Sequence, residues 1–190
     1  MTPFRVLFVC IGNVCRSPLG ELSLRPLLPE GFEVASAGVA ALVGEPMTPE
    51  AAVHLEAEGL SAEGFRSRQL VPSMVQESDL VLTATRAIRS RVLEDTPTAL
   101  RRTFTVLEFA ALLDVVAPDP GAGPADLVAL AAAERSRATL EDDDIPDPYR
   151  RGVEANARAA ALMGGAVRRI AAGLAPGLTE DSDLSATLRP

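Results

Sequence analysis

The sequence of 190 residues contains no tryptophan and no lysine, one tyrosine, one histidine and two cysteines. The two cysteines, Cys10 and Cys15, cannot form a disulfide framework for a chain of this size. With the single histidine, His54, they also provide too few ligands for a cysteine–histidine zinc site. No apolar run approaches the roughly 18 residues that a transmembrane helix needs. The sequence therefore predicts neither a metal centre nor a membrane span.

Basic residues are also fewer than acidic residues. The 18 basic residues, all arginine, face 26 acidic residues, which gives a net charge of −8 and a pI near 4.7. An acidic protein is a poor candidate for sequence-independent binding of nucleic acid. The apolar stretch at residues 6–10 has no basic region or longer apolar core before a cleavage site, so we expect a cytoplasmic protein. Any anionic ligand must be captured by a local site against the overall charge.

Four short apolar runs predict β-strands at residues 4–10, 32–35, 80–83 and 103–106. Helices are predicted at residues 18–28, at 49–58 with Thr48 as the N-cap, and at 152–174. Strands that alternate with helices are typical of a three-layer α/β fold, in which a four-stranded parallel sheet carries helices on both faces. With 47% hydrophobic residues the chain can bury such a core, and its length favours one domain, predicted over residues 1–174.

Two segments depart from the alternating pattern. Residues 115–144 begin with a loop rich in proline and glycine, continue as an alanine-rich helix predicted over 125–138, and end in the acidic run from Glu141 to Asp144. We interpret this segment as a helical insertion, and the acidic run as a solvated face. Residues 175–190 contain two prolines and scattered acids, and they are predicted to form a frayed tail.

The loop after the first predicted strand has the composition of an anion site. A loop that enters a helix points its backbone N–H groups into one concavity, and the helix dipole adds to the attraction. Gly12 permits a positive φ and Asn13 tolerates one, while the planar fork of Arg16 matches two oxygens of a phosphate group. The predicted phosphate-binding residues are Ile11, Gly12, Asn13, Val14, Cys15 and Arg16.

Cys10 stands where this loop begins. The converging N–H groups and Arg16 favour its thiolate, and Ser17 is placed to donate a hydrogen bond to it. Cys10 as an ordinary buried cysteine at a strand end is the weaker interpretation, because the loop provides both a nucleophile and a cradle for a tetrahedral dianion. This combination predicts covalent phosphoryl transfer through a phosphocysteine. A thiolate of this kind is also readily oxidised, so Cys15 is the expected redox partner of Cys10.

The segment from Val9 to Pro18 resembles the phosphate-binding loop of the low-molecular-weight protein tyrosine phosphatases, whose strand ends in V-C-x-G-N-x-C-R-S-P. That family has a four-stranded parallel sheet and a late Asp-Pro-Tyr that carries the general acid. The resemblance therefore implies Asp147 as the acid, since Tyr149 follows it; the rival Asp-Pro pair begins at Asp119.

The resemblance also assigns supporting roles. It implies that Ser36, with Asn13 and Ser17, organises the loop, and that Leu42 and Tyr149 form the substrate rim. Residues 41–44 are similar to the rim loop of bacterial members, especially those linked to exopolysaccharide synthesis. Phe65 stands where many members have a histidine, which removes one polar support of the loop.

The implied enzyme hydrolyses protein phosphotyrosine and aryl phosphates, releases inorganic phosphate, and needs no metal or organic cofactor. Three alternatives remain open. A thiol-dependent arsenate reductase of the same fold relays oxidation to a later cysteine, and this chain has none after Cys15. Protein-arginine phosphatases carry threonine at the position of Val14. A non-catalytic phosphopeptide-binding module is the last alternative, and the joint presence of Cys10, Arg16 and Asp147 argues against it.

Overall fold

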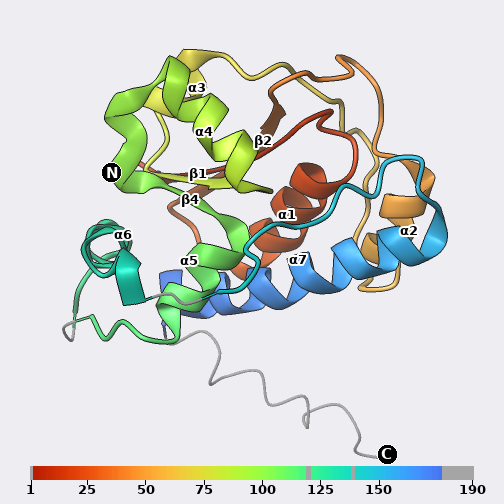
Figure 1. The fold of residues 1–190 in the computed structure, drawn as a ribbon. Coiled ribbons are helices and arrows are strands. Elements are labelled where there is room, and N and C mark those ends of the chain that lie inside the picture. Colours follow the sequence, from red (N-terminus) through yellow and green to blue (C-terminus); the bar gives the residue numbers. More distant parts are fainter. Residues whose placement is uncertain (1, 119–120, 138–139, 177–190) are drawn as a thin grey trace, which may run out of the picture.

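The computed structural model describes residues 2–118, 121–137 and 140–176 and shows a three-layer α/β fold (Figure 1). Four strands form one sheet in the order β2-β1-β3-β4, and every neighbouring pair is parallel. The predicted fold class is therefore confirmed. The strands are β1 (Phe4–Cys10), β2 (Phe32–Gly38), β3 (Leu80–Thr83) and β4 (Thr103–Thr105).

Helices cover both faces of the sheet because successive side chains of a strand point in opposite directions. Val6 and Phe8 of β1 belong to one core cluster, and Leu7 and Val9 belong to the other. The first cluster packs under α1, α5 and α7, and the second under α3 and α4. The helices are α1 (Arg16–Leu24), α2 (Pro49–Glu56), α3 (Pro72–Gln76), α4 (Arg86–Asp95), α5 (Val106–Leu113), α6 (Pro124–Ala133) and α7 (Gly152–Leu174).

The predicted bounds of several elements were wrong at their ends. The first helix begins at Arg16 rather than at Pro18, and after Leu24 it tightens into a 3₁₀ turn that contains Pro26. The second strand continues to Gly38, in register with the whole of β1. Smaller corrections shorten the helix predicted at 49–58 to Glu56 and the strand predicted at 103–106 to Thr105.

The helix predicted over residues 125–138 is shorter than expected. It runs from Pro124 to Ala133 as α6, and a 3₁₀ turn at Arg135–Arg137 follows. Arg135 lies over the ring of Phe104 and donates to the carbonyl oxygen of Thr103 at 2.7 Å. The segment is thereby attached to the β4 side of the sheet. The predicted tail lies outside the described residues beyond residue 176.

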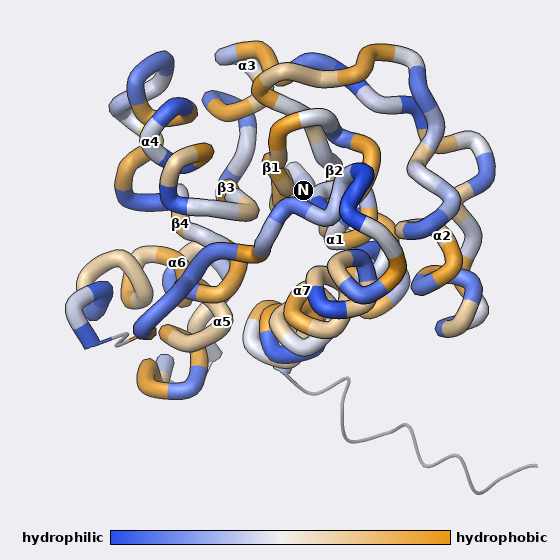
Figure 2. The backbone as a smooth tube through the Cα atoms, turned by 45° about the vertical axis from the view of Figure 1, so that its right-hand side comes forward, coloured by the Kyte–Doolittle hydropathy of each residue, from blue (hydrophilic) through white to orange (hydrophobic). Residues whose placement is uncertain are grey.

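The long helix α7 places a continuous apolar side against α1, α2 and α5. Figure 2 shows apolar and hydrophilic stretches alternating along it, as expected for a helix that buries one side. None of the helices among the described residues is both long enough and apolar enough to cross a membrane.

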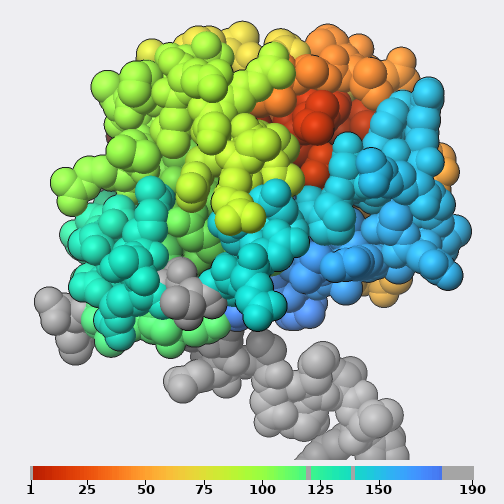
Figure 3. Space-filling view, in the orientation of Figure 1, coloured from red at the N-terminus to blue at the C-terminus, as the bar shows by residue number. Residues whose placement is uncertain are grey.

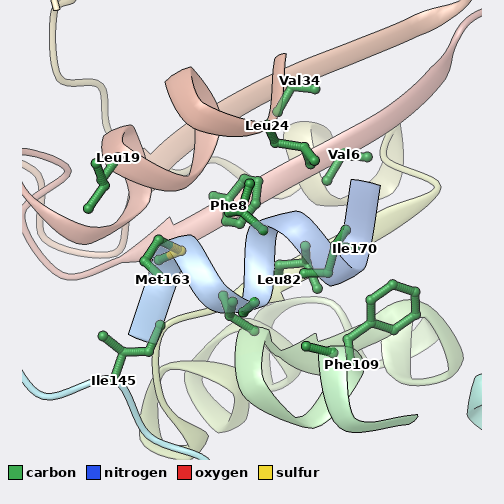
Figure 4. Close-up of a cluster of buried hydrophobic side chains, with 14 of the residues drawn as sticks. Val6, Phe8, Leu19, Leu24, Val34, Leu82, Phe109, Ile145, Met163 and Ile170 are labelled. Carbon is green, nitrogen blue, oxygen red and sulfur yellow. The ribbon is translucent and has the colours of Figure 1, made fainter. Parts of the chain in front are cut away.

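Gly20 of α1 packs closely against Phe8 and Met163, two side chains of the core cluster that Figure 4 labels. A Cβ atom there would lie 2.6 Å from a ring carbon of Phe8 and 3.1 Å from the sulfur of Met163.

We expect Gly20→Ala to destabilise the fold by about 1–3 kcal/mol, since overpacking outweighs the gain in helix propensity. The matched control is Gly165→Ala in α7, where a Cβ atom meets nothing within 4 Å. The control should be neutral or stabilising by up to about 1 kcal/mol. Urea unfolding of both variants measures the difference, and equal stabilities would contradict the packing described here.

Candidate active site

The site lies at the carboxyl end of β1, where the loop from Cys10 to Arg16 enters α1. Figure 3 shows this N-terminal segment at the bottom of a hollow between the segment that follows β2 and the segment that precedes α7. The cavity is lined by Cys10, Ile11, Gly12, Val14, Cys15, Arg16, Ala40, Leu42, Asp147 and Tyr149. The fold thus brings the predicted nucleophile, arginine, acid and rim residues into one place.

The carbonyl groups of the loop are held from outside by the chain that follows β2. The backbone N–H groups of Val39, Ala40, Leu42 and Thr48 donate to the carbonyl oxygens of residues 10, 11, 12 and 14, at 2.9–3.0 Å. Because the C=O and N–H of a peptide unit point in opposite directions, the N–H groups of residues 11, 12, 13 and 15 face the interior of the loop. This arrangement is a nest of donors for an anion.

Asn13 supplies the turn that closes the loop. Its φ is 55°, while Gly12 does not take the positive φ that its lack of a side chain would permit. Gly38 allows the loop to approach the end of β2, because a Cβ atom there would lie 2.4 Å from the carbonyl oxygen of Ile11. A side chain at residue 38 would therefore displace the loop.

The fully buried side chain of Asn13 is held by three hydrogen bonds. Its Nδ2 donates to Ser17 Oγ at 2.9 Å and to Ser36 Oγ at 2.8 Å, and its Oδ1 accepts from the backbone N–H of Arg68 at 2.8 Å. The hydroxyl of Ser36 in turn donates to the buried carboxylate of Glu21 at 2.6 Å. Both amide hydrogens and the amide oxygen of Asn13 are therefore paired.

With Phe65 in place of a histidine, the side chain of Asn13 still has all of its hydrogen-bond partners. The ring of Phe65 packs against the hydrophobic core, and the backbone of Arg68, three residues further on, supplies the donor to Asn13. Glu21 and Arg68 were not found from the sequence. A glutamate inside a helix and an arginine in a loop carry no signal that they meet Ser36 and Asn13.

Two donors face the sulfur of Cys10. The backbone N–H of Asn13 lies 3.2 Å from Sγ, and Ser17 Oγ lies 2.9 Å from it. Since Asn13 donates to Ser17 Oγ, the hydroxyl hydrogen of Ser17 has two acceptors within reach, and the sulfur at 2.9 Å is nearer than the carbonyl oxygen of Ala37 at 3.4 Å. Both donors stabilise a sulfur anion.

Arg16 is buried below the opening of the cavity, with 3% of its surface exposed. One terminal nitrogen donates to the carbonyl oxygen of Ile145, and the other pairs with Asp147 Oδ1, both at 2.9 Å. Its Nε is buried and has no partner among the described residues. A buried, unpaired N–H beside a nest of backbone donors suits an oxygen of a tetrahedral anion.

Cys15 lies in a different environment from Cys10. Its sulfur is 3.3 Å from Thr48 Oγ1, and burial raises the pKa of its thiol to about 11. Thr48 stands at the N-cap position of α2 as predicted, but its side chain makes no cap hydrogen bond and contacts Cys15 instead.

The rim of the cavity is apolar and partly exposed. Ile11 and Leu42 expose 44% and 40% of their surface beside Tyr149, and the guanidinium of Arg150 lies 5.1 Å from the Tyr149 ring centroid. Gln69 holds the rim loop by accepting from the backbone N–H of Ala41 at 3.0 Å. The rival acid Asp119 lies outside the described residues.

A cysteine within a nest of donors, on a four-stranded parallel sheet, defines an enzyme class that works on tetrahedral oxyanions. The family model of the low molecular weight phosphotyrosine protein phosphatases matches residues 5–127. The chain belongs to this family of enzymes.

Three known proteins illustrate how similar this chain is to other members of the family. A protein-arginine-phosphatase of Geobacillus stearothermophilus is 36% identical over 132 residues, which cover 70% of this chain and 88% of the relative. The low molecular weight protein-tyrosine-phosphatase Etp of Escherichia coli K12 is 32% identical over 150 residues, 79% of this chain and 80% of Etp. The crystal structure of the tyrosine phosphatase Wzb from Escherichia coli K30 in complex with sulphate superposes with a TM-score of 0.70 at 28% identity, covering 90% and 98% of the two chains.

We expect Asn13→Ala to lower the free energy of unfolding by at least about 2 kcal/mol. The substitution leaves the partly buried N–H of Arg68 without its acceptor, and it places alanine at a positive φ. Asn13→Gly removes the same side chain but tolerates the φ, so it should be less destabilising. Chemical unfolding separates the two effects, and an Asn13→Ala variant as stable as the wild type would contradict the network.

Proposed function

We propose that this enzyme hydrolyses phosphotyrosine in proteins, and aryl phosphates in general, through a phosphocysteine formed on Cys10. The observation that carries the proposal is the position of the Cys10 sulfur. It lies within hydrogen-bond distance of Ser17 Oγ and the backbone N–H of Asn13, in a cavity that also contains Arg16 and Asp147.

In the first step the thiolate of Cys10 attacks phosphorus, so that an S–P bond forms and the P–O bond to the phenol breaks. The inward N–H groups of the loop and the guanidinium of Arg16 stabilise the three equatorial oxygens in the transition state. Asp147, which lies beside Arg16 at the opening of the cavity, donates its proton to the departing phenolate.

In the second step water attacks the phosphocysteine. Asp147 accepts a proton from that water, the S–P bond breaks, and inorganic phosphate leaves as Cys10 returns to a thiolate. The nucleophile, the oxyanion donors and the acid all belong to the chain, so the steps balance without a metal or an organic cofactor. The reaction requires reduced Cys10, which agrees with the cytoplasmic location predicted from the sequence.

A second candidate is hydrolysis of phosphoarginine, because one relative bears the name of a protein-arginine-phosphatase. The cavity lining favours the aryl substrate. Val14, Ala40 and Leu42 offer apolar surface to a flat ring, whereas a guanidinium needs several acceptors for its N–H groups and Asp147 is the one carboxylate among the described residues of the lining. The Wzb structure in complex with sulphate supports an oxyanion as ligand but does not distinguish between these substrates.

The covalent mechanism predicts that Cys10→Ser lowers turnover of an aryl phosphate by more than roughly 1,000-fold while oxyanion binding persists. Binding depends on the backbone and Arg16, so phosphate or vanadate should still raise the Tm of the variant. Activity is measured with a metal chelator present and absent. Substantial residual turnover by Cys10→Ser would refute the phosphocysteine route.

The substrate assignment predicts that kcat/KM for a phosphotyrosine peptide exceeds that for a matched phosphoarginine peptide by roughly tenfold or more. Val14→Thr introduces a hydroxyl acceptor at the buried loop position and should shift this ratio towards phosphoarginine. Faster turnover of the phosphoarginine peptide by the wild type would contradict the proposed substrate and favour phosphoarginine instead.

Oxidation is expected to join Cys10 and Cys15, since both thiols line the same cavity. The resolving step needs the Cys15 thiolate, whose pKa is raised to about 11 mainly by burial; Cys10 and Asp147 add to the rise, and Thr48 and Arg16 oppose it. The thiolate fraction of Cys15, and with it the rate of disulfide formation, therefore increases roughly tenfold per pH unit below that value.

After peroxide treatment we expect a form lighter by two hydrogens, more of it at pH 9 than at pH 7, and recovery of activity with dithiothreitol. Cys15→Ser should lose this recovery because its Cys10 oxidises further. Mass spectrometry with activity assays measures both. Equal recovery of the wild type and Cys15→Ser would exclude a protective role for Cys15.

A further inference from the structure

The second half of the acidic run before Asp147, Asp143 and Asp144, is bound to the starts of two helices, while Glu141 and Asp142 are exposed. We propose that Arg86, Asp143 and Asp144 form an ionic clamp that positions Asp147 for proton transfer. The inference rests on the proposed role of Asp147 as the general acid, and it assigns the end of residues 115–144 to the catalytic cycle.

The clamp combines ion pairs with hydrogen bonds. Arg86 Nε lies 2.9 Å from Asp143 Oδ1, and the backbone N–H of Arg86 donates to Asp144 Oδ1 at 2.7 Å. Arg86 is the first residue of the ten-residue helix α4, where the helix dipole favours a carboxylate. The other oxygen of Asp143 lies 3.3 Å from the hydroxyl of Thr105, the N-cap of α5. Two carboxylates are thereby fixed to two helix starts.

Ile145, the residue after Asp144, connects the clamp to the loop from Cys10 to Arg16. The backbone N–H of Ile145 donates to the carbonyl oxygen of Ala84 at 2.8 Å, immediately before α4, and its side chain is fully buried. The carbonyl oxygen of Ile145 accepts from Arg16 at 2.9 Å. The chain that leaves the clamp is therefore held against the phosphate loop only two residues before Asp147.

The remaining path to the acid is short and stiff. Pro146 fixes its own φ and removes one degree of freedom between Ile145 and Asp147. On the far side, Asn156 of α7 donates to the carbonyl oxygen of Pro148 at 3.3 Å. The segment can be followed in Figure 1 as the stretch leading into α7. The clamp is the upstream anchor of the loop, and Asn156 is the downstream one.

Charge explains why the upstream anchor needs Arg86. Carboxylate oxygens of Asp142, Asp143 and Asp144 lie within 4.8 Å of one another, so their repulsion opposes a fixed conformation unless a cation offsets it. Arg86 makes ion pairs with both Asp143 and Asp144. More than half of the Arg86 side chain is exposed, so added salt should weaken the clamp.

The test measures how kcat/KM depends on the leaving group, using aryl phosphates that range from phenyl phosphate to 4-nitrophenyl phosphate. Displacement of the acid lowers kcat/KM for substrates whose phenolate must be protonated to leave. It has little effect on kcat/KM for substrates whose phenolate is a stable leaving group. We expect Arg86→Ala to lower kcat/KM for phenyl phosphate roughly tenfold and for 4-nitrophenyl phosphate less than about twofold. Arg86→Lys, which keeps the charge, should restore much of the loss.

Matched controls separate the clamp from general effects of charge. Arg91→Ala removes an arginine from the same helix, and Glu141→Gln removes an exposed acid from the same run; both should behave as the wild type. Asp147→Ala should give the largest leaving-group effect, and adding Arg86→Ala to it should change little, because the clamp acts through Asp147. Raising the ionic strength should reproduce the Arg86→Ala pattern in the wild type without any substitution.

The outcomes are distinguishable. The clamp is refuted if Arg86→Ala lowers kcat/KM equally for all substrates. It is also refuted if the leaving-group dependence of kcat/KM stays unchanged both in Arg86→Ala and at high salt. If Asp147→Ala also hydrolyses phenyl phosphate normally, the proposed function fails with it. If Asp147→Ala shows the effect and the clamp variants do not, the function stands and the clamp alone is refuted.

Discussion

The site depends on one constraint, the orientation of the peptide groups between Cys10 and Arg16. Four backbone donors from the chain after β2 hold the loop carbonyls outward, and the opposite ends of those peptide units face inward. Asn13 closes the turn from within, through hydrogen bonds to Ser17, Ser36 and Arg68. This double attachment explains how a protein with a net charge of −8 builds an anion site. Fixed dipoles and one buried arginine supply a local field that the surface charge does not cancel.

The same loop also fixes the relation between the proposed nucleophile, Cys10, and the proposed acid, Asp147. Arg16 begins α1 and reaches both the carbonyl oxygen of Ile145 and the carboxylate of Asp147. Residue 16 and residues 145–147, which are far apart in the sequence, thus meet at one guanidinium. Contacts on either side of Asp147, at Ala84 and at Asn156, hold the segment that carries this proposed acid. The proposed chemistry at Cys10 therefore depends on packing between helices that are far apart in the chain.

The sequence predicted the features that depend on neighbouring residues. The strands at residues 4–10 and 80–83 and the helix at 152–174 have the predicted bounds, since apolar runs and turn residues determine them locally. Cys10, Asn13 and Arg16 are also neighbours in the sequence, between a predicted strand and a predicted helix. Their joint appearance therefore indicated the position of the loop that lines the cavity. Ends of elements were less predictable, because Arg16 enters the first helix ahead of the proline that marks a typical start.

Contacts between distant residues could not be predicted. Nothing in the sequence relates Arg68 to Asn13, Thr48 to Cys15, or Arg86 to Asp143 and Asp144. The acidic run has the composition of a solvated face, yet Asp143 exposes only 13% of its side chain because it is paired across two helix starts. Such pairs join residues that are far apart in the sequence, so a local pattern carries no trace of them.

The central claim is that the phosphoryl group passes through the sulfur of Cys10. Its most direct test is acid quenching during turnover of an aryl phosphate, followed by peptide mass spectrometry under conditions that preserve phosphocysteine. We predict a transient adduct with the mass of one phosphoryl group on the peptide that contains Cys10, absent from Cys10→Ser. An adduct on another residue, or steady turnover with no covalent phosphoenzyme at any quench time, would contradict the claim.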